Sequence, residues 1–162
     1  MKEKNIPPRP APRKLGRSKG SYNYQATPTN QGQYYIRNIA TGKYLDVEGG
    51  RCQNGGNIHL WSYHGGANQR WYDGPNNSIM SACCQNMVLD IEQMSCNAGS
   101  NLQIWTYHGQ YNQQFIFEYG HLYNPVCNVA VDNSPYGGYD GNNVITWTKT
   151  GSQAQCWEII YA

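Results

Sequence analysis

The stretch LDVEGGRCQNGGNIHLWSYHGGANQRW, residues 45–71, recurs twice more along this chain of 162 residues. Residues 89–115 read LDIEQMSCNAGSNLQIWTYHGQYNQQF, and residues 131–157 read VDNSPYGGYDGNNVITWTKTGSQAQCW. Counted from the aspartate of each copy, a glycine stands at +9, an asparagine at +11 and a tryptophan at +15. A glutamine follows at +23 and an aromatic residue at +25, with no gap inside the frame. Because six positions match in three copies spaced 44 and 42 residues apart, we infer an internal repeat.

Each copy is expected to form four short strands. The first is apolar and aromatic (residues 34–39, 78–82 and 120–123), and the second carries the aspartate. Between them stand Gly42, Asn86 and Asn128, residue types that accept a positive φ. The third strand alternates, so Ile58 and Leu60 should face one way and His59 and Trp61 the other. The fourth strand starts at the glutamine-x-aromatic triplet.

The composition agrees with strands and turns. Charged residues make up 14% of the chain, while 18 glycines and 14 tyrosines are present. The chain contains no run of 18 apolar residues, which is the length needed to span a membrane. Since one unit cannot bury its own apolar face, three should close around a pseudo-threefold axis. We therefore predict an all-β protein, a β-trefoil of three repeats of about 42–44 residues (about 33–75, 76–119 and 120–162), in which Trp71, Phe115 and Trp157 meet inside.

The three glutamine triplets resemble the Gln-x-Trp repeats of ricin B-type (R-type) lectins. They are Gln69-Arg70-Trp71, Gln113-Gln114-Phe115 and Gln155-Cys156-Trp157. The spacing of the Leu-Asp, Asn, Trp and Asn-Gln elements is especially similar to that of xylan-binding modules and other bacterial R-type domains. The resemblance covers about residues 33–162 and implies a carbohydrate-binding lectin that is not an enzyme. We assign the glutamine triplets to the fold, because the glutamines should satisfy backbone groups where strands diverge.

Four positions of each unit could hold a sugar. A pyranose needs a flat aromatic wall together with a carboxylate and amides aimed at its hydroxyls. In R-type lectins the positions at zero, +13, +15 and +22 supply these groups, and some relatives place a further ring at +18. The resemblance thus implies two carbohydrate-binding sites, made of Asp46, His59, Trp61, His64 and Asn68 in unit one and of Asp90, Gln103, Trp105, His108 and Asn112 in unit two.

The third unit has lost part of this set. Asp132 and Trp147 remain, but Ile145 stands at +13 and Ala154 at +22. We expect a weak or inactive third site, in which Asp132 has mainly a structural role. Each aspartate could also simply cap backbone N–H groups at a turn, and each histidine at +18 could simply cover a loop.

The first residues differ in composition from the rest. Residues 1–20 hold seven basic residues and one acidic residue, a balance of +6, whereas the remainder carries −4. Four prolines oppose a helix there, so residues 1–32 are interpreted as a flexible basic Pro-rich arm before a domain at 33–162. The arm is either a solubilising extension or a docking segment for a protein partner or acidic surface. No apolar segment of a signal peptide follows the basic start, and the localisation stays open, with extracellular or surface action plausible.

Other chemistries find less support. Asp46 and Glu48, like Asp90 and Glu92, look like paired carboxylates on one strand face. Glycoside hydrolysis needs carboxylates on opposite sides of the bond, so no catalytic residue is assigned. The histidines and cysteines lack zinc-ligand spacing, and we expect no metal and no cofactor.

The six cysteines leave their oxidation state open. R-type domains often bridge −2 to +17, but those positions hold Tyr44/Tyr63, Val88/Tyr107 and Ala130/Lys149. Cys52 and Cys96 are equivalent at +6. If all six are oxidised, 15 pairings are possible, and free thiols are equally consistent with the sequence.

The sequence thus predicts a lectin for galactose, N-acetylgalactosamine or related glycans, acting through two shallow sites by multivalent attachment. Relatives bind other sugars on the same scaffold, so the sugar itself is not determined. The alternative is a structural, assembly or toxin-complex subunit that keeps the trefoil with degenerate sugar sites.

Overall fold

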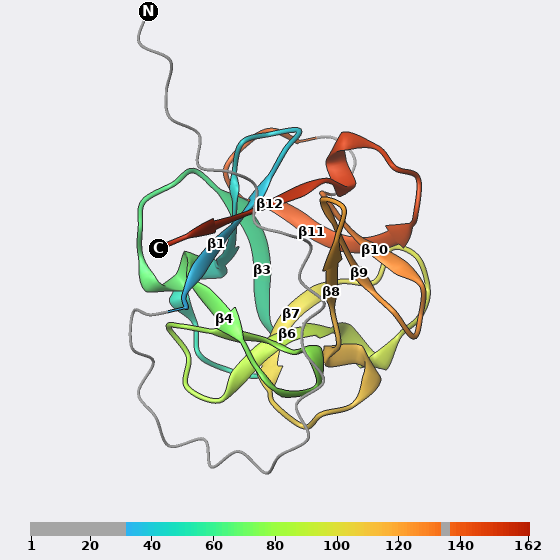
Figure 1. Ribbon diagram of the computed structural model, residues 1–162. Helices are drawn as coiled ribbons and strands as arrows, with labels where there is room; N and C mark the ends of the chain where they lie inside the picture. Colours follow the sequence, from blue (N-terminus) through green and yellow to red (C-terminus); the bar gives the residue numbers. More distant parts are fainter. Residues whose placement is uncertain (1–31, 134–136) are drawn as a thin grey trace, which may run out of the picture.

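The computed structural model describes residues 32–133 and 137–162 (Figure 1). All but the last residue of the proposed arm therefore lies outside the described residues. The described part folds into twelve strands in three successive groups of four, and no α-helix occurs in it. The strands are β1 (Tyr34–Asn38), β2 (Tyr44–Val47), β3 (Gly56–Trp61), β4 (Trp71–Asp73), β5 (Ile79–Ser81), β6 (Met87–Ile91), β7 (Leu102–Thr106), β8 (Ile116–Glu118), β9 (His121–Asn124), β10 (Val129–Asn133), β11 (Asn142–Thr148) and β12 (Trp157–Tyr161).

Short 3-10 turns join several of these strands. They are η1 (Glu48–Gly50), η2 (Ala67–Gln69), η3 (Pro75–Asn77), η4 (Glu92–Met94), η5 (Tyr111–Gln113) and η6 (Gln153–Gln155). Glu48 and Glu92 thus begin turns after β2 and β6, which corrects the expectation that they share a strand face with the aspartates. In the described part of the chain no helix is both long and apolar enough to cross a membrane.

The pairing of the strands confirms the β-trefoil. Hairpins β2–β3, β6–β7 and β10–β11 have equivalent registers, in which Asp46 pairs with His59, Asp90 with Gln103 and Asp132 with Ile145. Strand β3 also pairs with β7 and with β11, so the third strands of the units meet at the centre. Strand β1 pairs with β12 over its whole length and closes the ring (Figure 1).

Three asparagines at +11 form a closed ring of hydrogen bonds where the units meet. Asn57 Nδ2 donates to Asn143 Oδ1 at 3.0 Å, Asn143 Nδ2 to Asn101 Oδ1 at 2.9 Å, and Asn101 Nδ2 to Asn57 Oδ1 at 3.0 Å. Each amide therefore donates once and accepts once within the ring. The repeat of asparagine at this offset follows from the pseudo-threefold symmetry.

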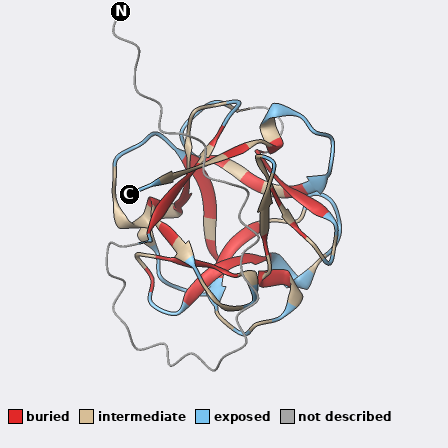
Figure 2. Cartoon of the chain, viewed as in Figure 1, coloured by how far each residue is buried: buried red, intermediate tan, exposed pale blue. Residues whose placement is uncertain are grey.

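The core lies inside the ring of strands (Figure 2). Trp71, Phe115 and Trp157 are fully buried there, as the repeat predicted. The indole N–H groups of Trp71 and Trp157 donate to Leu45 O at 3.2 Å and Val131 O at 2.9 Å, which are equivalent positions of units one and three. A buried indole N–H without such a partner would be costly, so these bonds fix the two rings in place.

The turn residues have the backbone that the sequence indicated. Gly42, Asn86 and Asn128 all have positive φ, between 54° and 69°. These turns join the first strand of each unit to the strand that carries the aspartate. They thereby set where each aspartate lies along its hairpin.

Two disulfides join successive units in equivalent ways. Cys52 at +6 of unit one bonds to Cys84, which precedes the aspartate of unit two by six residues. Cys96 at +6 of unit two bonds to Cys127, which precedes the aspartate of unit three by five residues. This single-residue offset concealed the repeat in the cysteine spacing. Cys83 and Cys156 are free.

Candidate functional site

The outer face of each β2–β3-type hairpin presents the candidate binding residues. Residues paired directly across antiparallel strands share a face, as do residues two apart on one strand. Trp61 pairs with Tyr44, two residues along the hairpin from the Asp46–His59 pair. Trp105 pairs with Val88, two residues from the Asp90–Gln103 pair. The tryptophan therefore stands beside the aspartate in both units. The same pairing places Trp147 beside Asp132.

The tryptophans at +15 point outward. Trp61, Trp105 and Trp147 are 39%, 36% and 45% exposed, in contrast to the buried Trp71 and Trp157. An indole that keeps this much surface in water gains no stability from core packing at that surface. Each of the three rings offers a flat apolar wall to a ligand.

The three aspartates are buried beside these exposed tryptophan rings. They are 2%, 2% and 9% exposed for Asp46, Asp90 and Asp132. Among the described residues, every hydrogen bond to their carboxylates comes from a side chain. They cap no backbone N–H group of a residue within 32–133 or 137–162, whereas such capping was the structural alternative for this aspartate. A buried carboxylate held only by side chains is an acceptor aimed at a fixed point.

In unit one, two imidazoles and one amide hold the carboxylate. His59 Nε2 lies 3.0 Å from Asp46 Oδ1, and Asn68 Nδ2 donates to the same oxygen at 3.0 Å. His64 Nε2 lies 3.1 Å from Oδ2. The Nδ1 atom of His64 accepts a bond from Gly66 N at 3.0 Å, so in the neutral ring the proton is on Nε2 and points at Asp46. His59 also stacks on Trp61, with ring centroids 5.2 Å apart.

In unit two, the amide of Gln103 takes the place of the His59 imidazole, and His108 remains at +18. Gln103 Nε2 donates to Asp90 Oδ1 at 2.9 Å, and Asn112 Nδ2 donates to Oδ2 at 3.0 Å. Gln113 Nε2 donates to Oδ2 at 2.9 Å, and His108 Nε2 lies 3.6 Å from it. The Oδ1 atom of Asn112 is buried and accepts no hydrogen bond from any described residue. Unit two therefore combines a carboxylate with an unused amide acceptor.

In unit three the carboxylate has lost these partners. Gln155 Nε2 donates to Asp132 Oδ2 at 2.7 Å and is its one hydrogen-bond partner in the described chain. Ile145 pairs across the hairpin with Asp132, where the other units have His59 and Gln103. The structure thus brings together the residues named for units one and two, and for unit three it brings together only Asp132 and Trp147.

The glutamines at +23 do more than the sequence indicated. As expected, they satisfy backbone groups: Gln113 Nε2 donates to Thr106 O at 3.1 Å, and its Oε1 accepts from His108 N at 2.9 Å. However, Gln113 and Gln155 also donate to the aspartate carboxylates. They position both the carboxylate and the backbone of the residue at +18. The geometry therefore links the fold and the site through the same side chain.

Sequence reasoning missed a contribution from a neighbouring unit beside Trp61 and beside Trp105. Asp140, in the hairpin loop of unit three, accepts from Ser62 N at 2.7 Å and from Lys43 Nζ at 2.7 Å, next to Trp61. Lys43 and Ser62 hold the pKa of the Asp140 carboxyl below its usual value. Asn54, at the same offset in unit one, accepts from Thr106 N at 2.8 Å, next to Trp105. The signal was present in the sequence, because Asn54 and Asp140 both stand at +8.

One cluster resembles a metal centre in its residue types. The sulfur atoms of Cys52, Cys83 and Cys84 lie within 4.8 Å of one another. Because Cys52 and Cys84 are joined in a disulfide, their sulfur atoms are not thiolate ligands while that bond is closed.

A comparison with known protein families identifies the family of this chain. The sequence profile of the ricin-type β-trefoil lectin domain matches residues 32–157. The chain belongs to this family. The three sequence repeats are the three units of this lectin domain. Membership of the family supports carbohydrate binding. Among proteins with curated descriptions, none matches the sequence.

Several solved structures share the fold of this lectin domain. The designed three-fold symmetric protein ThreeFoil is 29% identical, with a TM-score of 0.75, over 80% of this chain and 99% of that one. An exo-β-1,3-galactanase from Clostridium thermocellum is 26% identical, with a TM-score of 0.74, over 85% of this chain but only 31% of its own. The C-terminal half of an earthworm R-type lectin, in complex with GalNAc, is 19% identical, with a TM-score of 0.70, over 81% and 99%.

Binding of a sugar at unit two is expected to weaken as the pH is lowered. Burial raises the pKa of the Asp90 carboxyl, although the amides and His108 oppose the rise. Only the ionised carboxylate accepts from a sugar hydroxyl on both oxygens, and protonation starts at a higher pH than for an exposed aspartate. Affinity should therefore fall as the pH decreases through this raised pKa. Titration calorimetry on a Trp61→Ala variant, which isolates unit two, measures the profile.

A His108→Gln variant tests whether Asp90 sets this pH dependence. Since His108 lowers the pKa of Asp90, its removal should move the fall in affinity to slightly higher pH. If the pH dependence disappears in this variant, the Asp90 carboxyl does not set it.

Proposed function

We propose that this lectin domain binds glycans without altering them, through one site in unit one and one in unit two. The observation that carries the proposal is the exposed Trp61 and Trp105, each beside a buried carboxylate held by three side-chain donors. Such a site offers stacking to the apolar face of a pyranose and fixed acceptors to its hydroxyls. Unit three offers a wall, Trp147, without the polar partners.

Galactose-type sugars are the first candidates. The earthworm lectin with the same fold is in complex with GalNAc, and the Clostridium neighbour is a galactanase. The arrangement also supports binding without hydrolysis. Glu48 and Glu92 begin 3-10 turns rather than facing the aspartates across a bond, so neither aspartate has a carboxylate opposite it in the hairpin register.

A single site of this kind should bind weakly. Stacking that buries roughly 100 Å2 of apolar surface contributes about 2–3 kcal/mol, and exposed hydrogen bonds add about 1 kcal/mol each. We therefore expect a dissociation constant of about 1 mM for a monosaccharide, because the cost of ordering the ligand opposes these favourable terms. Two sites on one rigid body raise the affinity for a glycan-dense surface, so we propose multivalent attachment as the mode of action.

A glycan array with the intact chain tests the proposal. We expect binding to a family of related glycans that falls at least tenfold in Asp90→Ala, because that change removes the acceptor of unit two. Asp132→Ala is the matched control and should bind as the wild type does. Circular dichroism establishes that both variants fold. If the wild type binds no glycan, the assembly or toxin-complex role becomes the better explanation.

A further inference from the structure

A hollow that the sugar site does not use lies between unit one and the end of β12 in unit three. Its volume is about 280 Å3, and it is lined by Tyr35, Tyr44, Tyr63, Ile160, Tyr161 and Ala162. Three of the tyrosine rings contact one another, with centroids 5.2 Å apart for Tyr35 and Tyr63, 5.3 Å for Tyr44 and Tyr63, and 6.0 Å for Tyr35 and Tyr44. Tyr63 is 59% exposed although it is large and aromatic. We call this set of six residues the tyrosine hollow.

The set of three tyrosines that unit one contributes to the hollow is not repeated in the other units. The residues at the offsets of Tyr35, Tyr44 and Tyr63 are Ile79, Val88 and Tyr107 in unit two and His121, Ala130 and Lys149 in unit three. Asn76 Nδ2 donates to the Tyr107 hydroxyl at 2.8 Å, which ties down the one tyrosine that unit two retains. In unit three Lys149 Nζ lies 3.8 Å above the ring of Tyr123. The pseudo-threefold symmetry therefore does not account for the hollow.

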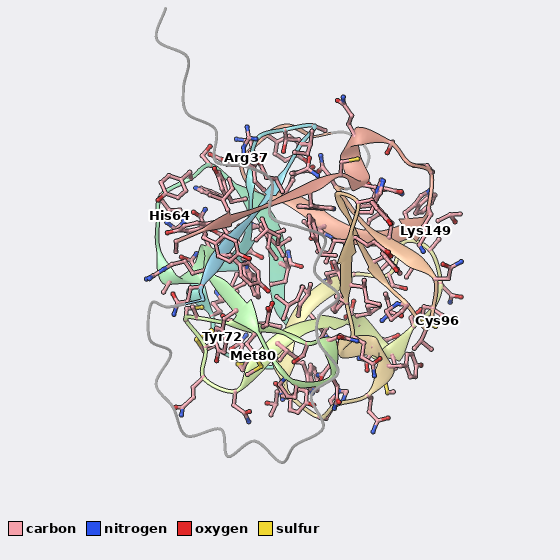
Figure 3. All side chains as sticks on the ribbon, in the orientation of Figure 1. Arg37, His64, Tyr72, Met80, Cys96 and Lys149 are labelled. Carbon is pink, nitrogen blue, oxygen red and sulfur yellow. A yellow bond between two sulfur atoms is a disulfide. The ribbon has the colours of Figure 1, made fainter. Side chains whose placement is uncertain are left out.

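The tyrosine hollow continues the candidate site of unit one. Tyr44 is the direct partner of Trp61 across β2 and β3, and Tyr63 lies two residues beyond Trp61 and directly before His64. Figure 3 shows His64 on the side of the molecule where the chain ends at β12. Tyr63 lies just past the end of β3, and two residues span at most about 7 Å, which is close to the length of one sugar residue. A glycan whose first ring stacks on Trp61 thus has its second ring at the tyrosines.

The chemistry of the lining favours a neutral polar ring. None of the six residues has a side chain that is ionised at neutral pH, and burial raises the pKa of the Tyr35 and Tyr44 hydroxyls. Nearby Arg37 is paired with Glu158, with Arg37 Nη1 3.2 Å from Glu158 Oε2. The side chains of this lining offer no charge to a charged ligand. Phenol rings offer faces to sugar C–H groups, and their hydroxyls both donate and accept hydrogen bonds.

We infer that the tyrosine hollow is a subsite for a second sugar residue, so that unit one recognises an oligosaccharide whereas unit two recognises a single sugar. The inference rests on the proposed function, since it extends the sugar site of unit one. It makes the two sites unequal. Unit one would select glycans by the residue that follows the terminal sugar.

Calorimetry on the full-length Trp105→Ala variant, in which unit one is the intact site, tests this inference. The probes are methyl β-galactoside against β-1,3-galactobiose, and xylose against xylotriose. We expect the longer sugar of the series that binds to bind about tenfold more tightly than its monosaccharide, because stacking of a second ring is partly offset by ordering it. Adding Tyr63→Ala should remove this gain and leave monosaccharide affinity unchanged. Because Tyr63 is exposed, the variant should fold, and the exposed Tyr161→Ala provides a second test.

Tyr107→Ala in the same background is the matched control, since Tyr107 is the unit-two counterpart of Tyr63. It should leave the gain in place. An equal gain with and without Tyr63 and Tyr161 overturns the subsite while the sugar site of unit one stands. Failure of the wild type to bind any of the four probes counts against the proposed function for these sugars, and the subsite falls with it.

Discussion

A Trp61→Ala, Trp105→Ala double variant is expected to lose attachment to a glycan-coated surface altogether, while each single variant retains one-site binding. Two sites that engage one dense surface raise the apparent affinity about 10²–10⁴-fold above a single site. Either single replacement should therefore remove most of this gain. Free-sugar titrations should show a stoichiometry of two in the wild type, one in each single variant and none in the double variant.

The geometry of the trefoil gives this prediction its size. Corresponding loops of different units lie on different sides of the molecule, as Figure 3 shows for His64, at +18 of unit one, and Lys149, at +17 of unit three. Sites that diverge in this way are suited to separate glycans on a dense surface. Surface plasmon resonance at high and low glycan density provides the measurement.

The exposed tryptophans make these variants informative about binding rather than stability. Each ring leaves more than a third of its surface in water, so its removal opens no cavity in the core. Trp147→Ala is the matched control from unit three, and it should leave both density responses unchanged. Attachment that survives in the double variant would place the binding surface elsewhere on the molecule.

The sequence was sufficient for the fold because the repeat constrains it three times. Trp71 and Phe115 stand at the same offset and are both buried, and the same offset argument separated them from the exposed Trp61 and Trp105. A periodic pattern of burial follows from strand alternation, which sequence reports directly. The arrangement of the candidate site residues beside one another followed from the same register.

The connections between units could not be predicted in the same way. Asn54 and Asp140 act on the tryptophan of another unit, and which hairpin meets which wall depends on how the units close in space. The disulfides were hidden for a related reason, because Cys84 and Cys127 differ by one residue in their distance from the next aspartate. Offsets within a unit describe its own strands and contain no information about its neighbours.

Removal of either interunit disulfide is expected to lower the free energy of unfolding by about 3–4 kcal/mol. Cys52–Cys84 and Cys96–Cys127 span 32 and 31 residues, and closing loops of this length in the unfolded chain accounts for that magnitude. Paired serine replacements at each bridge should shift the urea midpoint to lower concentration by similar amounts. Cys156→Ser is the control for a free cysteine and should shift it little.

Cys83 must be replaced as well if the Cys52–Cys84 bridge is to be tested cleanly. Its sulfur lies 3.0 Å from that of Cys84, so its thiolate is placed to exchange with the disulfide. Burial raises the pKa of the Cys83 thiol, which keeps the thiolate scarce at neutral pH and the native pairing in place. During unfolding this protection is lost. Urea titrations in a Cys83→Ser background therefore isolate the bridge itself, and an unchanged midpoint after its removal would show that strand pairing alone holds units one and two together.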